Sequence, residues 1–187
     1  MQTFHPTDLR FWIPYCEIRI VHETEPLTNA DDPRLKSYRN SRWNRHPNAK
    51  THDFIVEGRY CVERLLQSDY DVHSVLVAEG KSVEIPESLD RVVPVYSLPP
   101  AEICKLVGFD FHRGVMACAK RPALKPMAAF DQNVARPEIT IALLGLCERE
   151  NVGSIMRTAA ALGVERILMS PNTADPFARR TIRVSMG

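Results

Sequence analysis

The segment 151–163, Asn-Val-Gly-Ser-Ile-Met-Arg-Thr-Ala-Ala-Ala-Leu-Gly, holds the residues best suited to chemistry. It lies between two hydrophobic runs, 139–146 and 166–169, so the sequence predicts a strand, a helix over 152–162 and a second strand. Arg157 is the charged residue of this helix, and its guanidinium can bind a phosphate or stabilise negative charge that develops on an oxygen. Ligands of open α/β sheets bind beyond the carboxyl ends of strands, so a site is expected near Asn151.

The helix is amphipathic, and the face predicted to cover the sheet holds Val152, Ile155, Ala159 and Leu162. Arg157 points away from that face and has small neighbours. It is therefore either a solvated surface arginine or one that another backbone or subunit approaches closely. Asn151 either caps the helix or takes part in the site, and Gly163 is expected to end the helix. The turn lacks G-x-G-x-x-G and a Walker lysine, which argues against nucleotide-dehydrogenase and P-loop functions.

Basic residues gather in two places although the net charge of the 187-residue chain is only +1. Residues 33–52 contain six Lys/Arg and no Asp or Glu, and three arginines follow at 179–183. Candidate nucleic-acid contacts in and near predicted loops are Arg39, Arg42, Trp43, Arg45, His112 and Arg113. Cations can follow a phosphate backbone while Trp43 stacks on a base. The alternatives are a solvated basic arm and a histidine held by the backbone of a turn.

The cysteines number five and include no Cys-x-x-Cys pair, which favours reduced thiols over disulfides and predicts no metal site. No apolar run approaches the ~20 residues of a membrane span, and the N-terminus lacks the pattern of a secretory signal. We therefore expect a cytoplasmic protein without membrane contacts.

Hydrophobic patterning predicts an α/β protein with several parts. Residues 1–52 are expected to form a basic arm, with a short strand at 18–21 and a helix opening at 32–38. Residues 53–121 show a βαββαβ order, which is typical of a small α/β domain. The proline-containing segment 122–137 is expected to be a linker, and 138–187 to form the first part of another domain. Fifty residues are few for a domain of about 100–150 residues, so this last domain is expected to be incomplete.

The segment 151–163 resembles the first motif of the SpoU (TrmH) family of RNA ribose 2′-O-methyltransferases, N-x-G-x-x-x-R-x-A-x-x-x-G. The fixed positions of that motif are Asn151, Gly153, Arg157, Ala159 and Gly163. Residues 183–187 are similar to the next family segment, R-x-S-x-G, which is expected to open a strand-loop region. Segments 32–38, 54–58 and 111–117 are similar to the small RNA-binding domain that often precedes the catalytic domain.

The resemblance implies an incomplete SPOUT domain, Rossmann-like and knotted when complete, behind an RNA-binding domain. It implies methyl transfer from S-adenosylmethionine to rRNA or tRNA, in a homodimer, with Arg157 and Asn151 as catalytic residues. The cofactor-binding motifs of the family are expected beyond Gly187, so the chain alone is expected to be inactive. A non-catalytic RNA-binding module is the alternative function.

Overall fold

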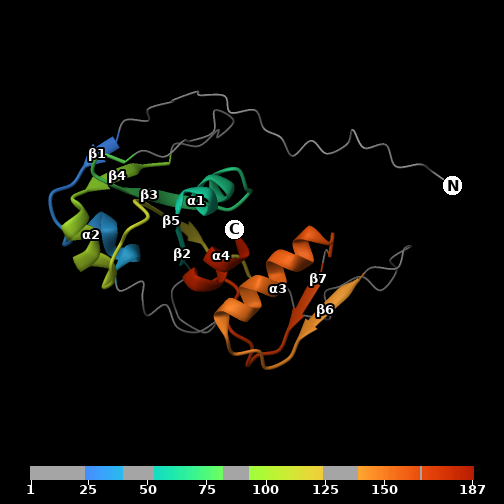
Figure 1. Ribbon diagram of the computed structural model, residues 1–187. Helices are drawn as coiled ribbons and strands as arrows, with labels where there is room; N and C mark the ends of the chain where they lie inside the picture. The colour runs from blue at the N-terminus through green and yellow to red at the C-terminus, as the bar shows by residue number, and fades with distance from the viewer. Residues whose placement is uncertain (1–23, 40–52, 82–92, 124–138, 165) are drawn as a thin grey trace.

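The computed structural model describes residues 24–39, 53–81, 93–123, 139–164 and 166–187 (Figure 1). The predicted strand at 18–21, most of the predicted linker, and the candidate residues Arg42, Trp43 and Arg45 lie outside these ranges. No helix in the described ranges is long and apolar enough to cross a membrane.

The first part of the molecule is a five-stranded mixed sheet in the order β1-β4-β3-β5-β2. Its strands are β1 (Thr24–Pro26), β2 (Asp53–Glu57), β3 (Val72–Ala78), β4 (Val95–Leu98) and β5 (Val115–Lys120). Its helices are η2 (Pro33–Tyr38, a 3-10 helix), α1 (Arg59–Leu66) and α2 (Pro100–Val107). β4 runs parallel to β1 and β3, whereas β5 runs antiparallel to β3 and β2. The βαββαβ order predicted for 53–121 is therefore present, with β1 added at the edge.

Apolar side chains cover both faces of this sheet, as alternation along its strands requires. One face packs on α1 and includes Phe54, Val56, Val75 and Ala117. The other packs on η2 and α2 and includes Ile55, Leu76, Leu98 and Met116. Proline suits the first turn of α2, and Gly108 ends the helix in the left-handed conformation, at a φ of 75°.

Residues 24–39, which fall within the basic arm predicted for 1–52, belong to this folded unit, and η2 confirms the helix opening predicted at 32–38. Leu35 and Tyr38 of η2 are fully buried, because the short helix lies on the same sheet face as α2. The Tyr38 hydroxyl donates to the Ser74 carbonyl and also contacts Ser74 Oγ, each at 2.9 Å. Burial raises the pKa of this hydroxyl above its ordinary value. The sequence pattern did not show that this segment packs on the sheet, because only a few buried side chains anchor it among many charged residues.

Replacing Tyr38 with phenylalanine is expected to lower the free energy of unfolding by about 1–2 kcal/mol, because Ser74 loses its buried partner. Urea unfolding monitored by circular dichroism measures the change. Tyr60→Phe is the matched control, since Tyr60 is 68% exposed. Equal stability of the Tyr38 variant and the wild type would contradict a structural role for η2.

The second part contains a pair of parallel strands, β6 (Thr140–Leu143) and β7 (Arg166–Met169), connected through α3 (Arg149–Ala161). The predicted strand-helix-strand crossover is therefore present, with its first strand shorter than 139–146. Helix α4 (Arg179–Ser185) follows. The prediction that 183–187 opens a strand-loop region is wrong, because residues 183–185 complete this helix and Met186 caps it.

Two details of α3 differ from the sequence prediction. The helix begins at Arg149 with Glu148 as its N-cap residue, so Asn151 lies inside the first turn and is not the cap. Val152 and Ala159 are buried as predicted, but Leu162 is 74% exposed. Leu162 follows the last helical residue, so the helical wheel does not fix its direction there. Gly163, with a φ of 71°, does end the helix as predicted.

Gly153 allows α3 and α4 to approach each other closely. A Cβ atom at this position would lie 2.6 Å from the Thr181 carbonyl oxygen and 2.9 Å from Val184 Cβ. The small residue thus accommodates a neighbouring helix of the same chain. The requirement for glycine comes from packing, since the backbone here is helical.

Gly153→Ala is expected to destabilise the protein by about 1–3 kcal/mol, since the added methyl collides with backbone and overpacks the α3–α4 contact. Elsewhere in a helix the same change stabilises, by about 0.5–1 kcal/mol. Thermal unfolding checks the sign, with Ser154→Ala on the exposed side as the control. A stabilised Gly153 variant would show that the two helices do not touch as described.

Candidate nucleic-acid interface

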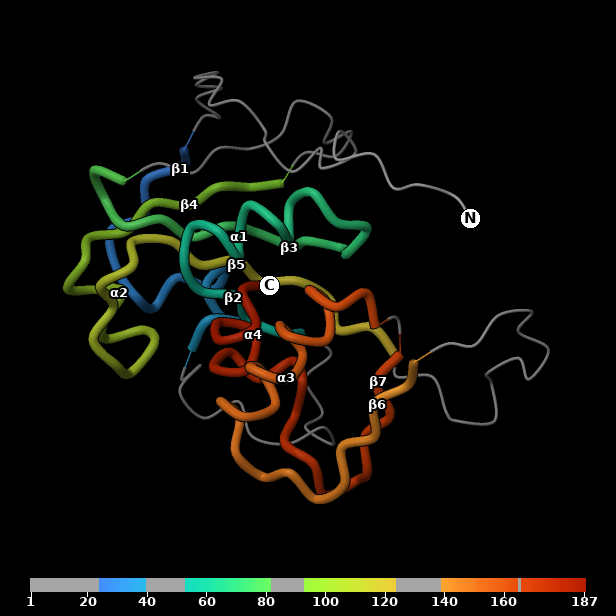
Figure 2. The backbone as a smooth tube through the Cα atoms, turned by 45° about the vertical axis from the view of Figure 1, so that its right-hand side comes forward, coloured from blue at the N-terminus to red at the C-terminus, as the bar shows by residue number. Residues whose placement is uncertain are grey.

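The second part packs against the first through α4 and the loop before it (Figure 2). Phe177 and Ile182 lie against the core on the α1 side of the five-stranded sheet. The Phe177 ring meets Phe54 edge-on at 5.1 Å between centroids, and Tyr70 packs beside both. An aromatic cluster therefore joins the two parts.

Polar contacts fix the same junction. Arg121, at the end of β5, binds both carboxylate oxygens of Asp175, with Nη1 2.9 Å from Oδ2, and lies over the Phe177 ring. Asp175 Oδ1 also accepts from the Phe177 amide at 2.9 Å. On the other side of α4, Arg64 donates to the Met186 carbonyl at 2.5 Å. These bonds hold α4 in a defined position beside α1 and β2.

A cleft of about 960 Å³ opens beside this junction. Both parts of the chain line it: Glu57, Gly108, Phe109, Asp110, His112, Arg113, Arg149, Ala178, Arg179, Arg180 and Arg183. Five arginines and one histidine therefore face two carboxylates. The excess of positive charge suits a polyanion.

Arg179 and Glu57 form the buried base of the cleft. Their side chains are 17% and 5% exposed and make a close ion pair. The guanidinium also lies 3.9 Å from the centroid of the Phe109 ring. Burial lowers the pKa of Arg179, and the neighbouring Glu57 carboxylate opposes that shift. Arg113 lies 3.8 Å from Glu57, so a second cation is held at the same carboxylate.

The remaining cations of the cleft are more accessible. Arg180 pairs with Glu150 of α3 across an exposed contact. Arg149 and Arg183 make no ion pair or hydrogen bond within the described ranges, so their guanidinium groups are available to a ligand. Arg149 belongs to the first turn of α3 and Arg183 to the last turn of α4, and the contact between these helices brings them to one cleft.

The structure brings together only some of the residues singled out from the sequence. His112 and Arg113 line the cleft, together with the arginines of 179–183. Arg39 lies elsewhere and is bound to Asp31 and to the Ala30 carbonyl, each at 3.1 Å. Asn151 and Arg157 are exposed on α3 and do not line the cleft, and Arg157 has no ion pair or hydrogen bond within the described part of the chain.

Sequence reasoning missed Glu57, Phe109 and Arg149 as site residues. Glu57 and Phe109 come from the first part of the chain, and only the docking of α4 gives them a role. The available signals for Glu57 were its acidic side chain at the end of a hydrophobic strand and its place in the segment 54–58, which resembles the family's RNA-binding domain. Arg149 shows no local signal beyond its place before the 151–163 motif.

The carboxyl edge of β6 and β7, where ligands of open α/β sheets bind, is filled by its own side chains. Ser170 Oγ accepts from the Gly145 amide at 2.9 Å, and Thr173 donates to the Leu143 carbonyl at 2.8 Å. Asn172 lies within 4 Å of the position that a Cβ of Gly145 would take. The described residues at this edge therefore leave no open site for a nucleoside cofactor.

The fold and the cleft define a class: a mixed α/β protein in which a five-stranded sheet with its helices and a strand-helix-strand crossover enclose a basic cleft. Residues 55–124 match the family model described as RNA 2′-O ribose methyltransferase substrate binding, and 138–187 match the SpoU rRNA Methylase family. The chain belongs to the SpoU (TrmH) family.

Several known proteins resemble this chain over most of its length. An uncharacterized tRNA/rRNA methyltransferase of Mycobacterium tuberculosis is 32% identical over 88% of this chain and 58% of its own. The 23S rRNA (guanosine(2553)-2′-O)-methyltransferase RlmP of Bacillus subtilis is 22% identical over 86% of this chain and 60% of its own. The AdoMet-bound rRNA methyltransferase structure from Sinorhizobium meliloti matches with a TM-score of 0.68 at 22% identity, over 89% of this chain and 62% of its own. The chain thus spans about three fifths of the length of these proteins.

Proposed function

We propose that the whole protein is an RNA 2′-O-ribose methyltransferase that transfers a methyl group from S-adenosylmethionine to rRNA or tRNA. The observation that carries this proposal is the arginine-lined cleft, because it lies between the segments that match the family's substrate-binding and methylase models. Guanidinium groups bind phosphates through two parallel hydrogen bonds, and an RNA strand offers a phosphate at each nucleotide. The names of the relatives support the same substrate class.

In this proposal Arg149 and Arg183 hold the RNA backbone in the cleft, and His112 and Arg113 extend the contact onto the first part of the chain. Arg157 lies two turns beyond Arg149 on α3, about 12 Å along the helix at 1.5 Å per residue. A strand bound at Arg149 and running along α3 therefore reaches Arg157. Asn151 lies between them and orients the nucleotide.

We propose that Arg157 acts on the reacting ribose. In methyl transfer, the ribose 2′-oxygen would bond to the methyl carbon while the methyl–sulfur bond of S-adenosylmethionine breaks, with S-adenosylhomocysteine as the leaving group and the 2′-hydroxyl proton passing to water. An arginine with a pKa above ~12 is a poor base, so Arg157 holds the target phosphate and stabilises negative charge on the 2′-oxygen. The cofactor supplies the methyl group, and its contacts come from outside the described residues.

Arg157→Lys is expected to lower the rate of methyl transfer by the whole protein about 10-fold, since lysine keeps the charge but loses the planar two-bond geometry. RNA affinity should change little, because lysine keeps the positive charge that attracts the phosphate. Single-turnover transfer to RNA measures the rate, with Arg34→Lys at an exposed distant arginine as the control. Full activity of the Arg157 variant would exclude the two-bond role.

A homodimer in the cytoplasm completes the proposal. Exposed apolar side chains on the second part support self-association: Ile139, Leu144 and Leu162 are each more than two-thirds exposed. The cysteines of the described ranges are free, which supports a reducing compartment. Light scattering of the whole protein should give the mass of two chains.

Transfer of a labelled methyl group to rRNA or tRNA, followed by alkaline hydrolysis, tests the function. A methylated 2′-oxygen cannot attack the neighbouring phosphodiester, so the labelled position should resist cleavage. Label on a base would contradict the proposal. RNA binding by the whole protein without any methyl transfer would favour a non-catalytic RNA-binding module. The filled edge of β6 and β7 is the observation that favours this alternative.

A further inference from the structure

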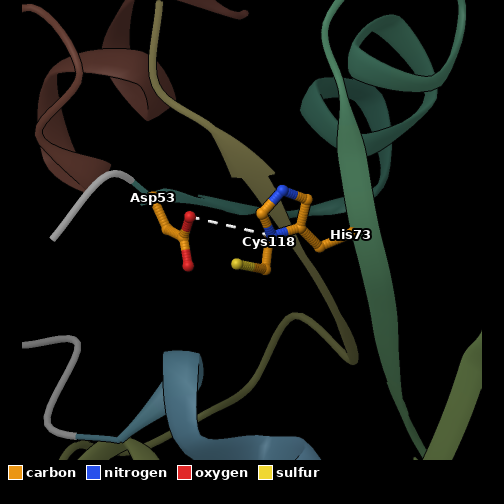
Figure 3. Close-up of side chains that lie close together, drawn as sticks. All are labelled: Asp53, His73 and Cys118. Atoms are coloured by element: carbon orange, nitrogen blue, oxygen red, sulfur yellow. Dashed lines mark ion pairs between the residues drawn. The ribbon is translucent and has the colours of Figure 1, made fainter.

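A bulge in β3 turns one histidine toward the η2 side of the five-stranded sheet. In the pairing of β3 with β5, Val72 faces Ala119 and Ser74 faces Cys118, so His73 is the additional residue. Val72 and Val75 both belong to the core on the α1 side, three positions apart, which strict alternation does not allow. Bulges re-aim side chains in this way. Figure 3 shows His73, Asp53 and Cys118 pointing toward one another.

The three side chains lie close enough together to hold a metal ion. Asp53, His73 and Cys118 each offer one ligand atom, and these atoms lie within 4.8 Å of one another. His73 Nδ1 is 3.7 Å from Asp53 Oδ1. A tetrahedral zinc ion with ordinary bond lengths places its ligand atoms about 3.3–3.6 Å apart. Closing this cluster onto an ion therefore needs only small side-chain rotations.

We propose that Asp53, His73 and Cys118 bind one Zn²⁺ ion per chain, with water at the fourth position. Thiolate, imidazole and carboxylate together form a ligand set that zinc accepts. The Ser37 hydroxyl donates to Asp53 Oδ2 at 3.0 Å, which orients the carboxylate and leaves Oδ1 for the ion. An ion enters from the solvent side, since the His73 and Asp53 side chains are 41% and 28% exposed while Cys118 is buried.

Such an ion would join three strands, because the ligands come from β2, β3 and β5. Through Ser37 it would also fix η2 to the sheet. The site shares no residue with the basic cleft. The sequence analysis predicted no metal site because the chain has no Cys-x-x-Cys pair. These ligands are separated by 19 and 44 residues, so no local spacing pattern could indicate them.

Competition between the whole chain and a chromophoric chelator for Zn²⁺ tests the proposal. The wild type should bind one ion, and each of His73→Gln, Asp53→Asn and Cys118→Ser should weaken binding at least 10-fold. Ser37→Ala should weaken it by about 10-fold, as loss of a hydrogen bond to a ligand does. Cys147→Ser and Asp69→Asn, outside the cluster, are the controls and should leave the affinity unchanged.

Co²⁺ gives a second readout, since a cobalt–thiolate charge-transfer band should appear in the wild type and vanish in Cys118→Ser. His73→Gln keeps the test valid if the buried cysteine variant misfolds, because His73 is partly exposed. The proposal is overturned if the wild type shows no saturable binding, if the control variants lose as much affinity as the ligand variants, or if bound cobalt shows no thiolate band.

Discussion

Replacing Arg149 and Arg183 together with glutamine is expected to weaken RNA binding by the whole protein about 100-fold or more at low salt. Each charge-assisted hydrogen bond contributes about 1.5–3 kcal/mol, or roughly 10-fold to 100-fold in affinity. Both guanidinium groups lack partners within the described ranges, so the free protein loses no ion pair in the double variant. Fluorescence anisotropy with a labelled RNA measures the affinity.

The salt dependence separates a phosphate contact from a general effect of charge. Each lost phosphate contact should reduce the slope of log K against log salt by about 0.7–0.9. Arg34→Gln combined with Lys36→Gln removes the same charge from η2, outside the cleft, and serves as the control. An equal loss of affinity in both double variants would show that RNA senses net charge and not the cleft.

Arg179→Met is expected to lower the free energy of unfolding by about 3 kcal/mol, near the low end of the range for breaking a buried ion pair. The Glu57 carboxylate stays buried without its main partner, while Arg113 at 3.8 Å offers partial compensation. Because the pair joins β2 to α4, the variant should also loosen the contact between the two parts. Urea unfolding measures the stability, and hydrogen exchange in α4 measures the loosening.

Arg180→Met is the matched control, since Arg180 is the neighbouring residue and its pair with Glu150 is exposed. Exposed pairs contribute about 0–1 kcal/mol, so little change is expected there. Adding Glu57→Gln to Arg179→Met should recover part of the lost stability, because it removes the uncompensated buried charge. Equal effects of the Arg179 and Arg180 variants would contradict the buried pair.

The strands and helices could be predicted where the local pattern was strong. The βαββαβ order followed from Val-rich runs and from Pro100 and Gly108 at the two ends of α2. Helix η2 was less evident because only Leu35 and Tyr38 are buried within a charged segment. The conformation of 183–187 could not be predicted, since α4 depends on contacts with β2 and α3 that are distant in sequence.

Some of the charged residues of the cleft could be predicted from the sequence, but the contacts that bring them together could not. Charged residues in or near predicted turns could be singled out from the sequence, and these included His112, Arg113 and the arginines of 179–183. Glu57 belongs to the cleft only because Arg179 reaches it across 122 residues of sequence. The zinc ligands depend on a bulge at His73, and a bulge follows from the pairing of strands. Local patterns do not specify such pairings.

Mapping where RNA crosslinks to the whole protein is the measurement that tests the proposed site most directly. Ultraviolet crosslinking followed by mass spectrometry should label both walls of the cleft, with crosslinked peptides covering 109–113 and 179–183. Excess unlabelled RNA and higher salt should suppress both signals together. Crosslinks found only outside the cleft, with 109–113 and 179–183 unlabelled, would contradict RNA recognition between the two domains.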